Sequence, residues 1–165
     1  MRKHLYFICP TDHLENIIQK NLSKDNYFIT SLGNSISFGP DLIEEINSLI
    51  KSRNIEEITF VLSDNNKFFK DALENQRFNN IRSLKQFYNF ILSEKIRSNK
   101  IWEKSDIRSL IIAYYLNLKS KELELLISDP LFNPINLSAK IYKRQKNIFN
   151  EVHADLFSLD SFSLN

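Results

Sequence analysis

Two short apolar segments, each followed directly by a polar turn, most constrain the fold of this chain. Residues 4–8 lead to the only cysteine, Cys9, and residues 58–62 lead to a turn that begins at Ser63. Short apolar runs bounded by turn residues are typical of strands covered on both faces in a parallel sheet. Because the carboxyl ends of such strands form a crevice where open sheets place their chemistry, we expect the two turns to share one site.

Helical patterns alternate with these strands in the first half of the chain. Asp12 is expected to cap a helix, with Glu15 three residues later, and residues 27–30 read as a second strand. A further helix is expected to begin at Pro40, because proline suits a first helical turn. After the strand at residues 58–62, Ser63 or the aspartate beside it is the expected cap of another helix.

The second half is more helical and ends in a hairpin. Apolar spacing predicts helices near residues 84–92, 107–118 and 120–127, and then two strands at residues 135–142 and 148–152. We therefore expect one α/β domain over residues 1–165, with a mostly parallel central sheet flanked by helices and a C-terminal hairpin.

Composition excludes several classes of function. The 22 basic and 20 acidic residues leave a net charge of +2, which is too small to hold the chain on nucleic acid or an anionic membrane. The only glycines, Gly33 and Gly39, cannot build a glycine-rich phosphate loop. No signal pattern and no run of about 18 apolar residues is present, and one cysteine cannot form an internal disulfide. We expect a cytoplasmic protein that does not bind membranes.

The order of these features resembles that of the β-class carbonic anhydrases. That family carries Cys-x-Asp-x-Arg after its first strand, Arg-Asn-x-Gly-Asn after its second, and Gly-His-x-x-Cys-Gly after its third. Here residues 9–13 read CPTDH, residues 28–34 read FITSLGN and residues 61–68 read VLSDNNKF. The resemblance covers residues 4–73 and extends to the C-terminal hairpin. It implies a β-carbonic anhydrase-like fold and a closely associated homodimer.

Most of the family's functional residues are replaced. Cys9 matches the first zinc-binding thiolate, and Gly33 and Asn34 match the end of the glycine turn. Thr11 stands where the family has aspartate and His13 where it has arginine, although Asp12 lies close enough to fill part of that space.

The two remaining ligand positions are also changed. Asp64 stands where the family has its zinc-binding histidine, and Lys67 stands where it has its second cysteine. A protonated ammonium group has no lone pair for a metal. The resemblance therefore implies a catalytically silent relative with no catalytic residue, no bound metal and no cofactor, acting by binding or assembly. The crevice for a small-molecule or anion ligand comprises Cys9, Thr11, Asp12, His13, Gly33, Asn34, Asp64 and Lys67.

Two interpretations of Asp64 and Lys67 stay open. Their charges can pair inside the crevice, in the place of the metal, or the turn is only a helix cap with Lys67 in solvent. If the strand ends converge, changing Asp64 to histidine and Lys67 to cysteine would create a zinc site with Cys9.

Two further functions are alternatives. Cys9, His13 and Asp64 are candidates for a rearranged metal site in a lyase or hydrolase. A basic hairpin tip is a candidate surface for nucleic acid, although such tips are usually only solvated; it contains Lys140, Lys143, Arg144 and Lys146.

Overall fold

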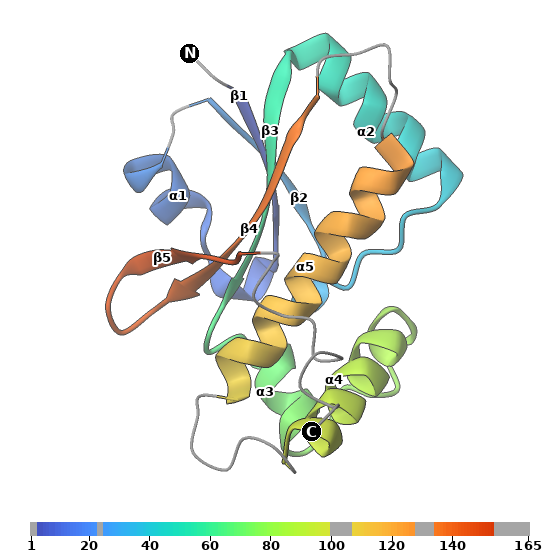
Figure 1. Cartoon of the computed structure of the whole chain (residues 1–165), viewed down its shortest axis with the longest axis vertical. Helices are drawn as coiled ribbons and strands as arrows, with labels where there is room; N and C mark the ends of the chain where they lie inside the picture. The colour runs from blue at the N-terminus through green and yellow to red at the C-terminus, as the bar shows by residue number, and fades with distance from the viewer. Residues whose placement is uncertain (1–2, 23–24, 100–106, 128–133, 154–165) are drawn as a thin grey trace, which may run out of the picture.

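A five-stranded sheet forms the centre of the molecule. The computed structural model describes residues 3–22, 25–99, 107–127 and 134–153. Within them the sheet has the order β2-β1-β3-β4-β5 (Figure 1). The first four strands are parallel and the last pair is antiparallel, which confirms the predicted fold class. The strands are β1 (Lys3–Ile8), β2 (Asn26–Thr30), β3 (Ile55–Ser63), β4 (Asn136–Lys143) and β5 (Ile148–Glu151).

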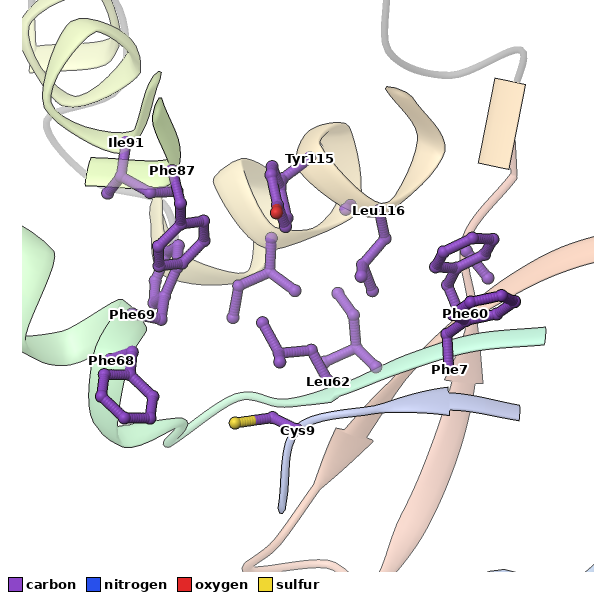
Figure 2. Packing of buried hydrophobic residues seen from close by; sticks show 14 of the residues in the cluster. Phe7, Cys9, Phe60, Leu62, Phe68, Phe69, Phe87, Ile91, Tyr115 and Leu116 are labelled. Atoms are coloured by element: carbon purple, nitrogen blue, oxygen red, sulfur yellow. The ribbon is translucent and has the colours of Figure 1, made fainter. Parts of the chain in front are cut away.

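The two central strands are buried on both faces, as their apolar sequences predict. Along β1, Phe7 points to one face of the sheet and Tyr6 to the other, and both side chains are buried. Phe7 stacks on Phe60 of β3 with ring centroids 4.5 Å apart, so the centre of the sheet is packed by aromatic rings (Figure 2).

The two faces are covered unequally. Figure 1 shows α2 (Pro40–Arg53) and α5 (Ile107–Ile127) on one side of the sheet and α1 (Glu15–Asn21) on the other. The larger cluster of buried residues also includes side chains from α3 (Lys67–Leu73) and α4 (Lys85–Asn99). Cys9 belongs to this larger cluster.

Two predicted helix caps are wrong. Asp12 does not cap α1, because it lies in the short 3-10 turn Pro10–Asp12 and the helix begins without a side-chain cap. Neither Ser63 nor Asp64 caps α3. Asn66 does so, since its Oδ1 accepts hydrogen bonds from the backbone N–H groups of Phe68 and Phe69, each at 3.0 Å.

The remaining element predictions agree with the structure in type and differ in extent. α2 begins at Pro40 as expected, and β4 and β5 form the predicted hairpin. The segments 107–118 and 120–127 are one continuous helix, α5, because Lys119 and Ser120 do not interrupt it. No helix in the described ranges combines the length and the apolar character that crossing a membrane requires.

Candidate functional site

The turns after β1 and β3 meet at the carboxyl ends of these strands, where the sequence predicts a crevice, and we call this region the strand-end crevice. From β1 the chain crosses to β2 on one side, and from β3 it crosses to β4 on the other, so the topology switches between these two strands. The turn after β1 and the turn after β3 meet here. The 3-10 turn Leu32–Asn34, which follows β2, joins them. The following residues build the crevice from these turns.

Cys9 is fully buried and its sulfur is already engaged. Sγ accepts a hydrogen bond from the backbone N–H of Gly33 at 3.1 Å, and it lies 3.1 Å from the hydroxyl of Thr11. Figure 2 shows Cys9 at the end of β1, on the same side of the sheet as Phe68 and Phe69. The structure therefore brings together three of the predicted site residues, Cys9, Thr11 and Gly33.

Asn34 fills the space between the two strand ends. Its Nδ2 donates to the carbonyl oxygens of Phe7 on β1, at 3.1 Å, and Val61 on β3, at 2.8 Å. The hydroxyl of Tyr115 on α5 donates to the main-chain oxygen of Asn34 at 2.7 Å. The Asn34 Oδ1 atom is buried and has no hydrogen-bond partner among the described residues. Asn34 thus joins both strands and leaves one free acceptor.

Asp12 reaches from the turn after β1 to the end of β3. The residue is 2% exposed, Oδ2 accepts from the backbone N–H of Ser63 at 2.9 Å, and Oδ1 accepts from Nδ2 of Asn66 at 2.9 Å. Burial raises the pKa of this carboxyl from 3.8 to about 6, and the bonds from Ser63 and Asn66 and the charges of Arg144 and His13 partly offset that rise. The carboxyl is therefore mostly ionised at neutral pH.

Arg144 closes the crevice from the hairpin. Its Nη2 donates to the main-chain oxygen of Asp12 at 2.6 Å, and its Nε donates to Oδ1 of Asn65 at 3.1 Å. Neither Arg144 nor Asn66 was predicted to be a crevice residue. The polar turn before α3 carried a signal for Asn66 as a cap, whereas nothing local to the hairpin indicated where Arg144 would bind.

Asp64 and Lys67 are not brought together in the crevice. Asp64 accepts from the backbone N–H of Arg144 at 3.3 Å, and its Oδ2 lies 4.0 Å from Nζ of Lys143. Lys67 is exposed, and its ammonium group lies 5.2 Å from the centre of the Phe78 ring. The arrangement agrees with the interpretation of this turn as a helix cap followed by a solvated lysine.

The rearranged metal site is not assembled either. His13 is exposed and has a left-handed backbone conformation, with φ of 53°, whereas Cys9 is buried and Asp64 faces the hairpin. Over the described ranges, no group of three or more His, Cys, Asp or Glu side chains is placed to hold a metal ion.

The basic hairpin is largely occupied by contacts within the chain. Lys140 pairs with Glu151 at 3.1 Å, Lys143 bonds to the hydroxyl of Ser109, and Arg144 binds the crevice. These contacts give no support to the nucleic-acid alternative, because three of the four basic side chains bond within the protein; Lys146 is exposed.

Several solved β-carbonic anhydrases are similar to this chain in overall fold. Wild-type CafD of the filamentous fungus Aspergillus fumigatus matches with a TM-score of 0.72 at 10% identity, over 93% of this chain and 90% of that one. CafA of the same fungus matches with a TM-score of 0.65 at 12% identity, over 93% and 76%. A tetrameric β-carbonic anhydrase of Sordaria macrospora matches with a TM-score of 0.65 at 13% identity, over 92% and 80%.

The chain has the β-carbonic anhydrase fold. No family model matches the sequence, and no curated protein matches it. At sequence identities of 10 to 13%, the similarity shows a shared fold and no more than that.

The residues of the crevice do not fit the zinc ion that the fold implies. Zinc sites of catalytic type need three protein ligands with free lone pairs around one point. Here Cys9 offers a thiol, but Asp64 faces the hairpin and the exposed Lys67 has no lone pair while it is protonated.

Proposed function

We propose that this chain is a catalytically silent protein with the β-carbonic anhydrase fold, acting by binding or assembly. The observation that carries the proposal is the state of the three ligand positions. Of the three, only Cys9 has a side chain that zinc prefers.

The loss of zinc has a large chemical consequence. Zinc lowers the pKa of a bound water from about 15.7 to about 7, so that hydroxide is available for attack near neutral pH. Without it, forming hydroxide costs about 12 kcal/mol more, and the hydrogen-bond network of Asp12 offers no comparable compensation.

The test is metal analysis and carbon dioxide hydration on the same purified sample. We expect no stoichiometric zinc and no hydration above the buffer rate, with an active β-carbonic anhydrase as the positive control. One tightly bound zinc per chain together with hydration activity would overturn the proposal.

Assembly is the first form of the proposed role, as a homodimer. The matching β-carbonic anhydrases from Sordaria macrospora are tetrameric, which supports self-association of a chain with this fold. Sedimentation at micromolar concentration is the appropriate measurement. A dimer would support the proposed role in assembly. A monomer at every concentration would contradict that role.

Binding in the crevice is the second form, and the free groups there specify the ligand chemistry. The N–H groups of Gly33 and Ser63 already donate within the protein, whereas Oδ1 of Asn34 is a buried acceptor with no partner among the described residues. A small hydrogen-bond donor therefore suits the crevice better than an anion does. The test compares the increase in melting temperature caused by millimolar guanidinium with that caused by millimolar bicarbonate. A larger increase with bicarbonate would show that the crevice prefers an anion.

A further inference from the structure

The strand-end crevice is organised around a single carboxylate. The two oxygens of Asp12 receive donors from two different segments: the backbone N–H of Ser63 at the end of β3 and the side chain of Asn66 at the start of α3. The main-chain oxygen of the same residue receives Arg144 from the hairpin. Asp12 thus joins its own turn to three other segments of the chain.

The contacts around Asp12 continue into a connected network. Asn66 donates to Asp12 and also caps α3 through its Oδ1 atom, so one side chain links the carboxylate to the helix. Oδ1 of Asn65 accepts from the hydroxyl of Ser63 at 2.7 Å and from Nε of Arg144 at 3.1 Å. Both donors to the carboxylate are therefore fixed by further bonds.

The physical requirement for such a centre is that buried donors be satisfied. If the carboxylate were removed, the N–H of Ser63 and the amide of Asn66 would be buried without acceptors. Hydrogen bonds to an ionised oxygen are also stronger than bonds between neutral groups. The carboxylate can therefore hold the segments together even though its own burial is unfavourable.

We infer that Asp12 replaces a metal ion as the structural centre of the strand-end crevice, and that it keeps the crevice closed over Cys9. The inference rests on the proposed metal-free state of the chain. It goes beyond the loss of ligands, since it assigns to one residue the organising role that the fold elsewhere gives to zinc.

The single cysteine provides a local readout. Cys9 is fully buried, so its reaction with a thiol reagent at pH 7.5 under native conditions reports the opening of the crevice. We expect Asp12→Ala to raise the labelling rate about tenfold or more, because it removes two bonds to an ionised group. The rise should persist at low denaturant concentrations where the protein stays folded.

Asp41→Ala is the matched control, since Asp41 is an exposed carboxylate in the first turn of α2. It should label at the parent rate. If Asp12→Ala does not fold, Arg144→Ala tests the same centre from the hairpin side and should give a smaller rise. An unchanged rate in a folded Asp12→Ala, or in Arg144→Ala where the first variant does not fold, would overturn the inference.

Zinc content measured on the same samples separates this inference from the proposed function. If the parent holds zinc and a chelator raises labelling as much as Asp12→Ala does, the metal is the centre and both statements fail. If the parent is free of zinc and labelling does not respond to Asp12→Ala, only the inference fails.

Discussion

Gly33 and Phe87 are in such close contact that a methyl group on Gly33 would lie 3.1 Å from Cε1 of the Phe87 ring. Gly33 also has a φ of +61°, which is unfavourable for other residues. Gly33→Ala should therefore destabilise the chain by about 1 to 3 kcal/mol through strain and overlap, as measured by urea unfolding.

The control for this change is the other glycine. Gly39 has a φ of −78° and nothing lies within 4 Å of the position of an added Cβ. Because Gly39 is the N-cap of α2, Gly39→Ala should still lower the free energy of unfolding, but by less than about 1 kcal/mol and by less than Gly33→Ala does. Equal losses in the two variants would contradict the geometry of the turn after β2.

The stability of the chain should depend on pH through Asp12. Burial raises the pKa of this carboxyl in the folded state to about 6 from an ordinary value of 3.8, so the folded chain binds the proton more tightly than the unfolded chain does. The contribution of Asp12 is therefore fully present below about pH 4 and is lost as the pH rises through about 6, with a limit of about 3 kcal/mol.

Unfolding free energies between pH 4 and pH 7, compared with those of Asp12→Asn, isolate this contribution. The parent should lose stability relative to the variant as the pH rises. A difference that stays constant, or that changes in the opposite direction, would show that the hydrogen bonds to the carboxylate outweigh its burial.

Lys67 and its neighbour Asn66 should respond very differently to substitution. Lys67→Met should change stability by less than about 1 kcal/mol, because the residue is exposed and its ammonium group makes a cation–π contact with Phe78. Asn66→Ala should cost about 1 to 2 kcal/mol or more, since it removes the cap of α3 and a donor to Asp12. Thermal unfolding of the two variants side by side is sufficient. A large loss in Lys67→Met would restore the paired interpretation of Asp64 and Lys67.

Introducing the two missing ligands should not create a zinc site. The side chain at position 64 is directed toward the hairpin and that at position 67 is exposed, while Cys9 is held from the β2 side by Gly33. Asp64→His combined with Lys67→Cys should therefore bind zinc no more tightly than the parent, as measured by competition with a chromophoric chelator. Tight binding that is lost on adding Cys9→Ser would show that the three positions share one centre after all.

The fold was largely predictable because its strands and helices have local signals. Residues 58–62 are mostly apolar and lie in a strand buried on both faces, and Pro40 begins a helix where its missing N–H is harmless. The hairpin was predictable for the same reason, since alternating segments flank its turn.

The crevice was less predictable, because its contacts join residues that are distant in sequence. Asp12 has the composition and spacing of a helix cap, yet its carboxylate binds Ser63, 51 residues away. Asn34 bonds to two strands at once, which no local pattern encodes. Local rules assigned Asp12 to the nearest helix, whereas its carboxylate accepts from Ser63 and Asn66, which are distant in sequence.

The bond between Arg144 and Asp12 has a consequence for how the protein is made. The two residues are 132 positions apart, so the segment that supplies the donor is synthesised long after the segment that accepts it. The sheet cannot be completed before β4 is synthesised, and the bond to Asp12 cannot form before the hairpin turn is synthesised. Long-range pairing of this kind slows folding. Until then the edge of β3 that pairs with β4 stays open, and an unpaired apolar strand edge makes the incomplete chain prone to aggregation.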